Sequence, residues 1–207
     1  VQKERSRNAA SQDIDDWQEI MAISESEFIG YDNLEANIRI ARYRRVKSKN
    51  STTYQLVFDH TPFYGNSGGQ IGDIGYIESA NEKIEIVATE KENGLIIHIA
   101  KRLPENPTAE FHAVVNAEAR QQAANNHTAT HLLQKALKNV LGDHVAQAGS
   151  FVDADRLRFD FTHSQKVTDE QIRKVEDEVN EMIFAGLNVD IQNMSKEEAM
   201  ASGAMAL

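Results

Sequence analysis

The sequence predicts an α+β protein in which a small antiparallel β-barrel precedes a two-layer α/β core of helices laid on an antiparallel sheet. Between residues 24 and 110, short apolar stretches alternate with period two and are separated by glycine-rich turns, which is typical of antiparallel strands. From residue 111 onward, two long segments repeat their apolar residues at helical spacing. Pro104 and Pro107 lie between the two patterns. We therefore divide the chain into a linker helix (1–23), a barrel (24–110) and an α/β core (111–207).

The composition narrows the class of protein. The 207 residues carry a formal net charge of −10 and include no cysteine. A chain this acidic argues against a nonspecific nucleic-acid-binding domain, although it is compatible with a local basic patch. The lack of cysteine excludes disulfides and thiolate metal ligands within this sequence. No apolar run approaches the roughly 18 residues of a membrane span and no signal-peptide pattern occurs, so we expect a cytoplasmic protein.

The first residues predict a connector helix. Ala10, Ile14, Trp17 and Met21 follow helical spacing, and we expect a helix over residues 1 to about 22. The sequence begins with valine rather than methionine and ends in an apolar run. We therefore expect a piece of a longer polypeptide.

A basic cluster follows the first predicted strand. Residues 34–41 alternate apolar and polar side chains, which predicts a strand with one buried face. No acidic residue occurs between Glu35 and Asp59. Clustered cations in an acidic chain favour contact with the phosphates of RNA, whereas the alternative is a solvated hairpin edge. The candidate RNA-binding residues are Arg39, Arg42, Arg44, Arg45, Lys47 and Lys49.

A glycine-rich loop follows the next strand, which we place at residues 54–58. Residues 59–75 hold five of the eleven glycines in the chain. Glycine lets a ligand approach the main chain closely, so the turn Ser67-Gly68-Gly69-Gln70 is a candidate binding loop. The alternative is a hairpin turn with a bulge. The loop is not a nucleotide-binding P-loop, because no Lys-Ser or Lys-Thr follows the glycines.

The remaining elements follow from turn and cap signals. Asn93-Gly94 predicts a hairpin, and Gly142 and Gly186 predict the ends of two long helices. Thr168 with Gln171, and Ser195 with Glu198, predict capping boxes at two helix starts. The predicted strands are 76–77, 84–89, 95–100, 111–115, 145–152, 157–161 and a short one at Val189 and Ile191.

Two histidines four residues apart lie within the first long helix. His127 and His131 share one helix face, where two imidazoles can bind one metal ion. Zinc prefers four tetrahedral ligands, and His144, Asp160 and His163 are conceivable further donors. The alternative is a pair of polar residues with no ligand.

Three motifs in this order resemble the editing domain of alanyl-tRNA synthetase. The motifs are Asn126-His127-Thr128-Ala129-Thr130-His131-Leu132-Leu133, the loop Thr61–Asp73, and Leu157-Arg158-Phe159-Asp160-Phe161. The resemblance covers roughly residues 24–207. It implies the barrel-plus-core fold of the second additional domain that alanyl- and threonyl-tRNA synthetases share.

The resemblance also implies the roles of particular residues. His127 and His131 correspond to two of four zinc ligands, and the other two belong to a Cys-x-x-x-His motif that this sequence does not contain. Gln147 corresponds to a glutamine of the editing pocket, and we predict catalytic roles for these three residues. The predicted substrate-binding residues are Thr128, Thr130, Ser67, Gly68, Gly69, Gln70 and Asp73.

The implied activity is hydrolysis of tRNA(Ala) that carries serine or glycine. A polar pocket built from Gln147 with Thr128 or Thr130 would discriminate serine from alanine, because alanine leaves polar groups unpaired. The parent enzyme would ligate alanine to tRNA(Ala) with ATP and Mg²⁺ bound outside this sequence. With half the zinc shell missing, we expect this piece to be impaired or inactive. The alternatives are a freestanding alanyl-tRNA deacylase, a noncatalytic tRNA-binding module and a structural spacer.

Overall fold

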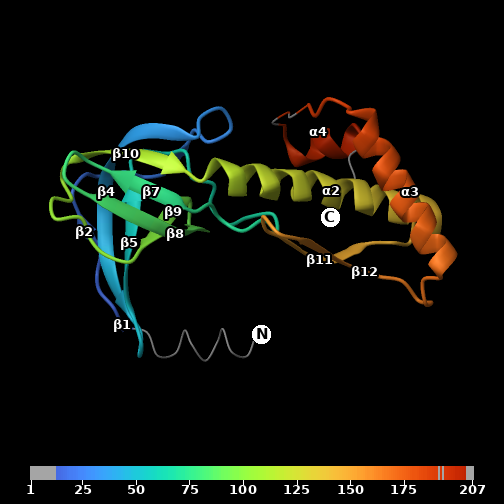
Figure 1. Ribbon diagram of the computed structural model, residues 1–207, viewed down its shortest axis with the longest axis horizontal. Coiled ribbons are helices and arrows are strands. Elements are labelled where there is room, and N and C mark those ends of the chain that lie inside the picture. Colours follow the sequence, from blue (N-terminus) through green and yellow to red (C-terminus); the bar gives the residue numbers. More distant parts are fainter. Residues whose placement is uncertain (1–12, 191, 193, 204–207) are drawn as a thin grey trace. The chain divides into compact units, whose positions relative to one another are not determined.

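The computed structural model describes residues 13–190, 192 and 194–203. The chain divides into two compact units, Val1–Ala123 and Ala124–Leu207, each with its own hydrophobic core (Figure 1). We describe each unit by itself.

The first unit is a closed barrel of six antiparallel strands. Around the barrel the strands are β4 (Glu35–Lys47), β10 (Glu110–Val115), β7 (Gly75–Glu78), β8 (Lys83–Glu92), β9 (Leu95–Ala100) and β5 (Thr52–Phe58). The barrel closes because β5 pairs with β4 as well as with β9. The predicted antiparallel barrel is therefore confirmed. A further pair of short strands, β3 (Glu27–Phe28) and β6 (His60–Thr61), runs parallel beside it in the same unit.

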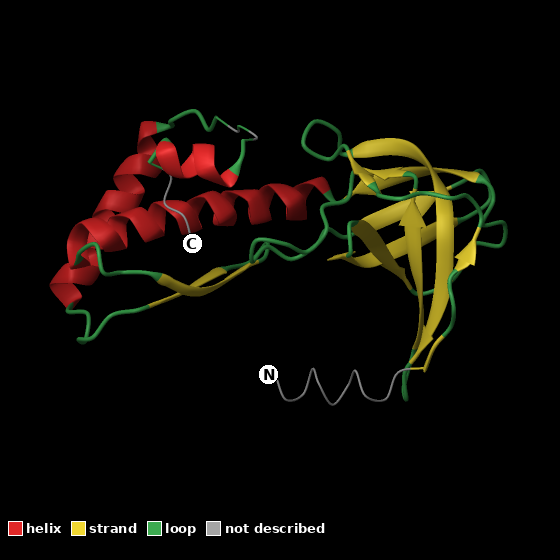
Figure 2. Cartoon of the chain, turned by 180° about the vertical axis from the view of Figure 1, so that it is seen from behind, coloured by secondary structure: helices red, strands yellow, loops and turns green. Residues whose placement is uncertain are grey.

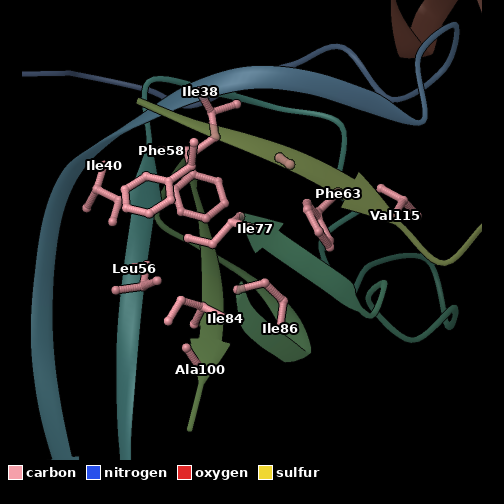
Figure 3. Close-up of a cluster of buried hydrophobic side chains, with 12 residues drawn as sticks. Ile38, Ile40, Leu56, Phe58, Phe63, Ile77, Ile84, Ile86, Ala100 and Val115 are labelled. Atoms are coloured by element: carbon pink, nitrogen blue, oxygen red, sulfur yellow. The ribbon is translucent and has the colours of Figure 1, made fainter. Parts of the chain in front are cut away.

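Alternating side chains fill the barrel interior. Ile38 and Ile40 on β4 are each 1% exposed, and Leu56 and Phe58 on β5 are fully buried. These four belong to a cluster of twelve buried residues (Figure 3). Full burial of such side chains stabilises the fold by about 1.5–3 kcal/mol each. A bulge after Ile40 leaves the adjacent Ala41 buried as well, so the alternation changes phase there.

The N-terminal segment corrects the sequence prediction. β1 (Asp13–Ile14) and β2 (Gln18–Glu19) are strands paired with β4, so a helix is wrong over this stretch. The predicted part at 1–12, with Ala10, lies outside the described residues. β4 is thirteen residues long and extends past the end of its pairing with β10. The backbone groups of this extension form hydrogen bonds with β1 and β2. Ile14 is 46% exposed, so its helical spacing marked no buried face.

The strand predicted at 111–115 belongs to the barrel and not to the second domain, where we expected it. We assigned it to the second domain, but β10 lies between β4 and β7 in the barrel wall. The compact unit extends to Ala123. It therefore includes the first residues of helix α2 (Ala117–Leu141).

The second unit contains the rest of α2 and a hairpin with two further helices. The hairpin strands are β11 (Gln147–Val152) and β12 (Leu157–Phe161), and the helices are α3 (Asp169–Ala185) and α4 (Lys196–Ala201). Both predicted capping boxes are present. Gly142, with φ of 115°, follows α2, and Gly186, with φ of 60°, ends α3. The predicted helix ends are therefore confirmed.

The hairpin and α3 pack on α2 within this unit (Figure 2). Ala136, Leu137, Val145 and Val175 form its buried cluster, and Phe159 and Phe161 pack against it. This arrangement confirms the predicted layer of helices on an antiparallel sheet. Val189 belongs to no strand and Ile191 lies outside the described residues, so a strand is wrong at Val189. No helix among the described residues is long and apolar enough to cross a membrane.

Candidate functional site

The predicted glycine-rich loop is a tight hairpin within the first unit. The N–H groups of Ser67 and Gln70 donate to each other's carbonyl oxygens over 3.1 and 3.0 Å. Gly68 and Gly69 have φ of 60° and 80°, the positive values that a type I′ turn requires at both central positions. The predicted turn is therefore a hairpin turn, and the N–H groups of Ser67 and Gln70 are hydrogen-bonded within it.

The base of this loop is packed against β8. A Cβ at Gly72 would lie 1.6 Å from the carbonyl oxygen of Thr89, so only glycine fits there. The N–H of Asn66 donates to the same carbonyl oxygen over 3.0 Å. The Thr89 hydroxyl donates to the carbonyl oxygen of Asp73 over 2.8 Å. The loop therefore holds one conformation at its base.

Asp73 has a partner that the sequence analysis missed. The carboxylate of Asp73 is 5% exposed and accepts hydrogen bonds from the guanidinium of Arg120 in α2. We predicted Asp73 as a substrate-binding residue, and the structure places its oxygens in this buried ion pair. The available signal was Arg120 itself, a basic residue on the same side of the long helix as His127.

The histidine pair lies on α2 in the second unit. The rings of His127 and His131 are 5.1 Å apart between centroids with 14° between their planes. His127 is half-buried and His131 is exposed. Burial lowers the pKa of His127, and the neighbouring His131 lowers it further. Both effects favour the neutral imidazole, which is the form that binds metal ions.

The described residues supply two candidate metal ligands at this pair. No group of three or more potential ligands occurs among them. The other conceivable donors have different partners: Nε2 of His144 lies 2.8 Å from Nδ1 of His163, and Asp160 forms an ion pair with Arg158. Two parallel imidazoles at i and i+4 are ligands of the type that zinc binds. They provide two of the four ligands that a tetrahedral zinc site requires.

The two predicted threonines have different surroundings. Thr130 is 6% exposed, and its hydroxyl donates to the carbonyl oxygen of Asn126 over 2.8 Å. Thr128 is exposed and lines a cavity of about 670 Å³ between α2 and the end of α3. Leu132 and Met182 are among the apolar residues of the same cavity. Thr128 is therefore the threonine that a ligand can reach.

Gln147 lies at one end of the hairpin β11–β12. Its side-chain amide donates to Oγ of Ser150 over 3.2 Å. At the other end, the amide of Asn126 donates to the carbonyl oxygen of Asp153 over 2.9 Å. Six residues of extended strand span roughly 20 Å. The structure thus places the hairpin turn, and not Gln147, beside the residue that precedes His127.

The basic cluster on β4 is largely engaged within its own unit. The guanidinium carbon of Arg44 lies 4.2 Å from the centre of the Trp17 ring, and that of Arg42 lies 5.6 Å from it. Arg44 also donates to Oε1 of Gln55 over 2.6 Å. Such stacking and hydrogen bonding hold the two arginines on the protein surface.

The other members of the cluster fall into two groups. Arg45 pairs with Asp15 over 3.1 Å, and Arg39 pairs with Glu110 over 3.7 Å. Lys47 and Lys49 are exposed near the turn that joins β4 to β5, and they form no ion pair with a described residue. The two lysines are therefore the cations of the cluster that are best placed to meet a phosphate.

Comparison with known proteins adds the family. Residues 1–121 match the family model "tRNA synthetases class II (A)". The chain belongs to this family of class II tRNA synthetases. Its whole length is similar to the alanine–tRNA ligases of Bacteroides fragilis (strain YCH46), Cytophaga hutchinsonii and Porphyromonas gingivalis, at 53, 49 and 48% identity. The chain spans about a quarter of the length of these relatives, 24% in each case. The predicted resemblance to alanyl-tRNA synthetase is confirmed.

Proposed function

We propose that this chain is the editing part of an alanyl-tRNA synthetase and contributes to hydrolysis of tRNA(Ala) mischarged with serine or glycine. The observation that carries the proposal is the pair His127 and His131 on α2, in a chain similar over its whole length to alanine–tRNA ligases. The parent enzyme would attach alanine to tRNA(Ala) with ATP and Mg²⁺, and would work in the cytoplasm.

The histidines give the proposal its chemistry. His127 and His131 would hold a zinc ion through two nitrogens, and zinc supplies a Lewis acid that binds an amino group or lowers the pKa of water. The depressed pKa of His127 keeps its imidazole unprotonated at neutral pH. Direct attack by water fits the absence of a convincing nucleophilic side chain in the sequence.

Thr128 gives the proposal its specificity. Its hydroxyl donates to the carbonyl oxygen of Ala124 over 3.1 Å, so its oxygen can still accept a hydrogen bond, and the residue lines the cavity. A serine hydroxyl can donate to that oxygen, whereas the methyl group of alanine cannot. Loss of a hydrogen bond in a site built for it discriminates strongly against the analogue that lacks the hydroxyl. Gln147 enters the proposal through the resemblance alone.

The test uses the 207-residue chain beside a chimeric ligase. The chimeric ligase is the B. fragilis relative in which the matching segment is replaced by this chain. Release of serine from seryl-tRNA(Ala) is measured against release of alanine from alanyl-tRNA(Ala). We expect the chimeric ligase to hydrolyse the seryl ester at least about tenfold faster than the alanyl ester. Equal rates on the two esters, or no hydrolysis at all, would overturn the proposal.

Variants then assign the residues. Thr128→Val removes the acceptor while preserving shape, and we expect the preference for serine over alanine to fall about tenfold. Thr130→Val serves as the matched control, because that hydroxyl is buried and points to the helix backbone. Gln147→Ala decides whether the resemblance carries over at that position: an unchanged rate would remove Gln147 from the site. Activity of the isolated 207-residue chain would favour the freestanding deacylase.

Binding of tRNA is a second part of the proposal. Lys47 and Lys49 are the best-placed cations, while Arg44 and Arg45 are held by neighbours. We expect Lys47→Gln with Lys49→Gln to weaken tRNA binding and to reduce the slope of log affinity against log salt by about one for each phosphate that is no longer neutralised. Arg44→Ala with Arg45→Ala should change the slope less. Salt-independent binding would contradict phosphate recognition by this strand.

A further inference from the structure

The Arg120 side chain gathers three separate segments of the first unit. Its Nε donates to the two carboxylate oxygens of Asp73 over 2.8 and 2.9 Å. Nη1 donates to the carbonyl oxygen of Gly30 over 2.7 Å, and Nη2 donates to that of Pro62 over 2.8 Å and also to Asp73. The side chain is 14% exposed. We call Arg120, Asp73, Gly30 and Pro62 the arginine clamp.

The backbone segments that the arginine clamp joins pack closely against each other. A Cβ at Gly30 would lie 2.2 Å from the carbonyl oxygen of Pro62, so the two backbones are in direct contact. The rings of Phe28 and Tyr64 each lie 5.9 Å from the guanidinium carbon of Arg120. These aromatic rings shield the ion pair from water, which strengthens it.

The clamp acts on the base of the glycine-rich hairpin. Asp73 accepts a hydrogen bond from the N–H of Tyr64 over 2.7 Å and donates its own N–H to the carbonyl oxygen of Tyr64 over 2.9 Å. Tyr64 in turn contacts the turn, because its phenol oxygen lies 2.9 Å from Oγ of Ser67. A hydrogen-bonded path therefore runs from Arg120 to the residue that opens the Gly68-Gly69 turn.

The start of α2 is fixed to the same place. The N–H of Asn116 donates to the carbonyl oxygen of Ile74 over 2.8 Å, and its side chain accepts from the N–H of Ala119 over 3.1 Å. Arg120 is the next residue along the helix. The helix start thus holds the guanidinium at the point where the hairpin ends.

We infer that Arg120 is a positioning residue for the hairpin Tyr64–Asp73, which it fixes in the conformation that a ligand meets. The inference rests on the proposed function in that Ser67, Gln70 and Asp73 of this hairpin are among the substrate-binding residues that the resemblance implies. Arginine is required because its planar fork donates to a carboxylate and to two carbonyl oxygens at once. Lysine carries the same charge but is a single point donor on a flexible stem.

The first experiment is amide hydrogen exchange on the 207-residue chain. We expect Arg120→Lys to leave the barrel folded and to raise the exchange rates of the Tyr64, Ser67 and Gln70 amides at least about tenfold. Arg102→Lys is the matched control, since Arg102 is 51% exposed and forms an ion pair with Glu82 in the same unit, away from the hairpin. Unchanged exchange in the hairpin, or equal changes in both variants, would overturn the inference.

The second experiment measures kinetics in the chimeric ligase. We expect Arg120→Lys to raise KM for seryl-tRNA(Ala) about tenfold with kcat changed less than about threefold, because a looser hairpin loses binding and not chemistry. Asp73→Asn should do the same, and the double variant should match the larger single effect, since both residues act through one clamp. Multiplied effects would overturn the inference. If the parent chimera hydrolyses nothing, the proposed function fails, and the exchange experiment still decides the role of Arg120.

Discussion

The first unit (the barrel unit) and the second unit (the helical unit) differ in the number of residues in their buried clusters. The barrel encloses a cluster of twelve buried residues, whereas the cluster in the described part of 124–207 has four. The barrel unit pairs the buried carboxylate of Asp73 with Arg120. The helical unit keeps His131 and Thr128 at its surface.

Both units expose large apolar side chains, and the most exposed of them lies in the helical unit. The helical unit exposes Ile172, Ile183, Phe184, Leu187, Val189, Met194 and Met200, and Phe184 reaches 88%. The comparison indicates that the barrel is built around a larger core, while the helical unit carries candidate functional residues on exposed faces.

Matched core truncations give the largest expected effect. Leu56→Ala removes a fully buried side chain from the barrel, and Leu137→Ala removes a 5% exposed one from the helical unit. We expect Leu56→Ala to lower the free energy of unfolding by about 4 kcal/mol and Leu137→Ala to lower it by about 2 kcal/mol. The loss is smaller for Leu137→Ala because the small core of the helical unit can relax around the cavity. Denaturation followed by Trp17 fluorescence and by helical circular dichroism separates the units. Equal losses would break the comparison.

Acid provides the next test. Complete burial lowers the pKa of His98 in the barrel to about 3, while the unfolded chain has its ordinary value near 6.5. Below pH 6.5 the unfolded state therefore binds a proton at His98, whereas the folded state does not. The free energy of unfolding falls as the pH drops toward 3. The slope is at most about 1.4 kcal/mol per pH unit. His98→Gln should remove this slope, and an exposed control, His112→Gln, should keep it.

Helix caps give a smaller effect. Thr168→Ala deletes the capping box of α3, which packs Val175 into the core, and should cost about 1 kcal/mol. Ser195→Ala deletes the same motif at α4, where no residue is buried, and should leave the free energy of unfolding nearly unchanged. Thermal denaturation of both variants measures this. A comparable loss at α4 would mean that its helix carries more of the fold than its exposure implies.

The smallest stability effect belongs to the exposed apolar face. Phe184→Ser should change the free energy of unfolding by less than about 0.5 kcal/mol, yet it should raise the solubility limit of the chain. Val87→Ser, at a 37% exposed barrel residue, is the control and should change solubility little. Static light scattering against concentration distinguishes the two, and equal behaviour would argue that the apolar face of the helical unit is ordinary surface.

Local signals predicted the fold better than they predicted the site. Strand alternation, the Asn93-Gly94 turn and the capping box at Thr168 depend on neighbouring residues, and the structure confirms them. The helix prediction is wrong over residues 13–19 because β4 is longer than its barrel partners and pairs there with β1 and β2. No local pattern encodes such long-range pairing.

The site depended on contacts that sequence spacing does not contain. The i, i+4 spacing of His127 and His131 was sufficient to place them on one face. The bond between Arg120 and Asp73 joins residues 47 positions apart. The sequence places Arg120 on the same helix side as His127, but it does not indicate which carboxylate Arg120 binds. The difference between Thr128 and Thr130 likewise depends on which side of α2 the hairpin and α3 cover.

The most direct test compares the two histidine pairs of the helical unit. His127 and His131 carry the proposed chemistry, whereas His144 and His163 bind each other through ring nitrogens 2.8 Å apart. In the chimeric ligase, His127→Ala should slow hydrolysis of seryl-tRNA(Ala) on the order of 100-fold, because a zinc ligand is removed. His144→Ala should leave the rate within about twofold. Equal rates for His127→Ala and the unchanged chimera would contradict the account.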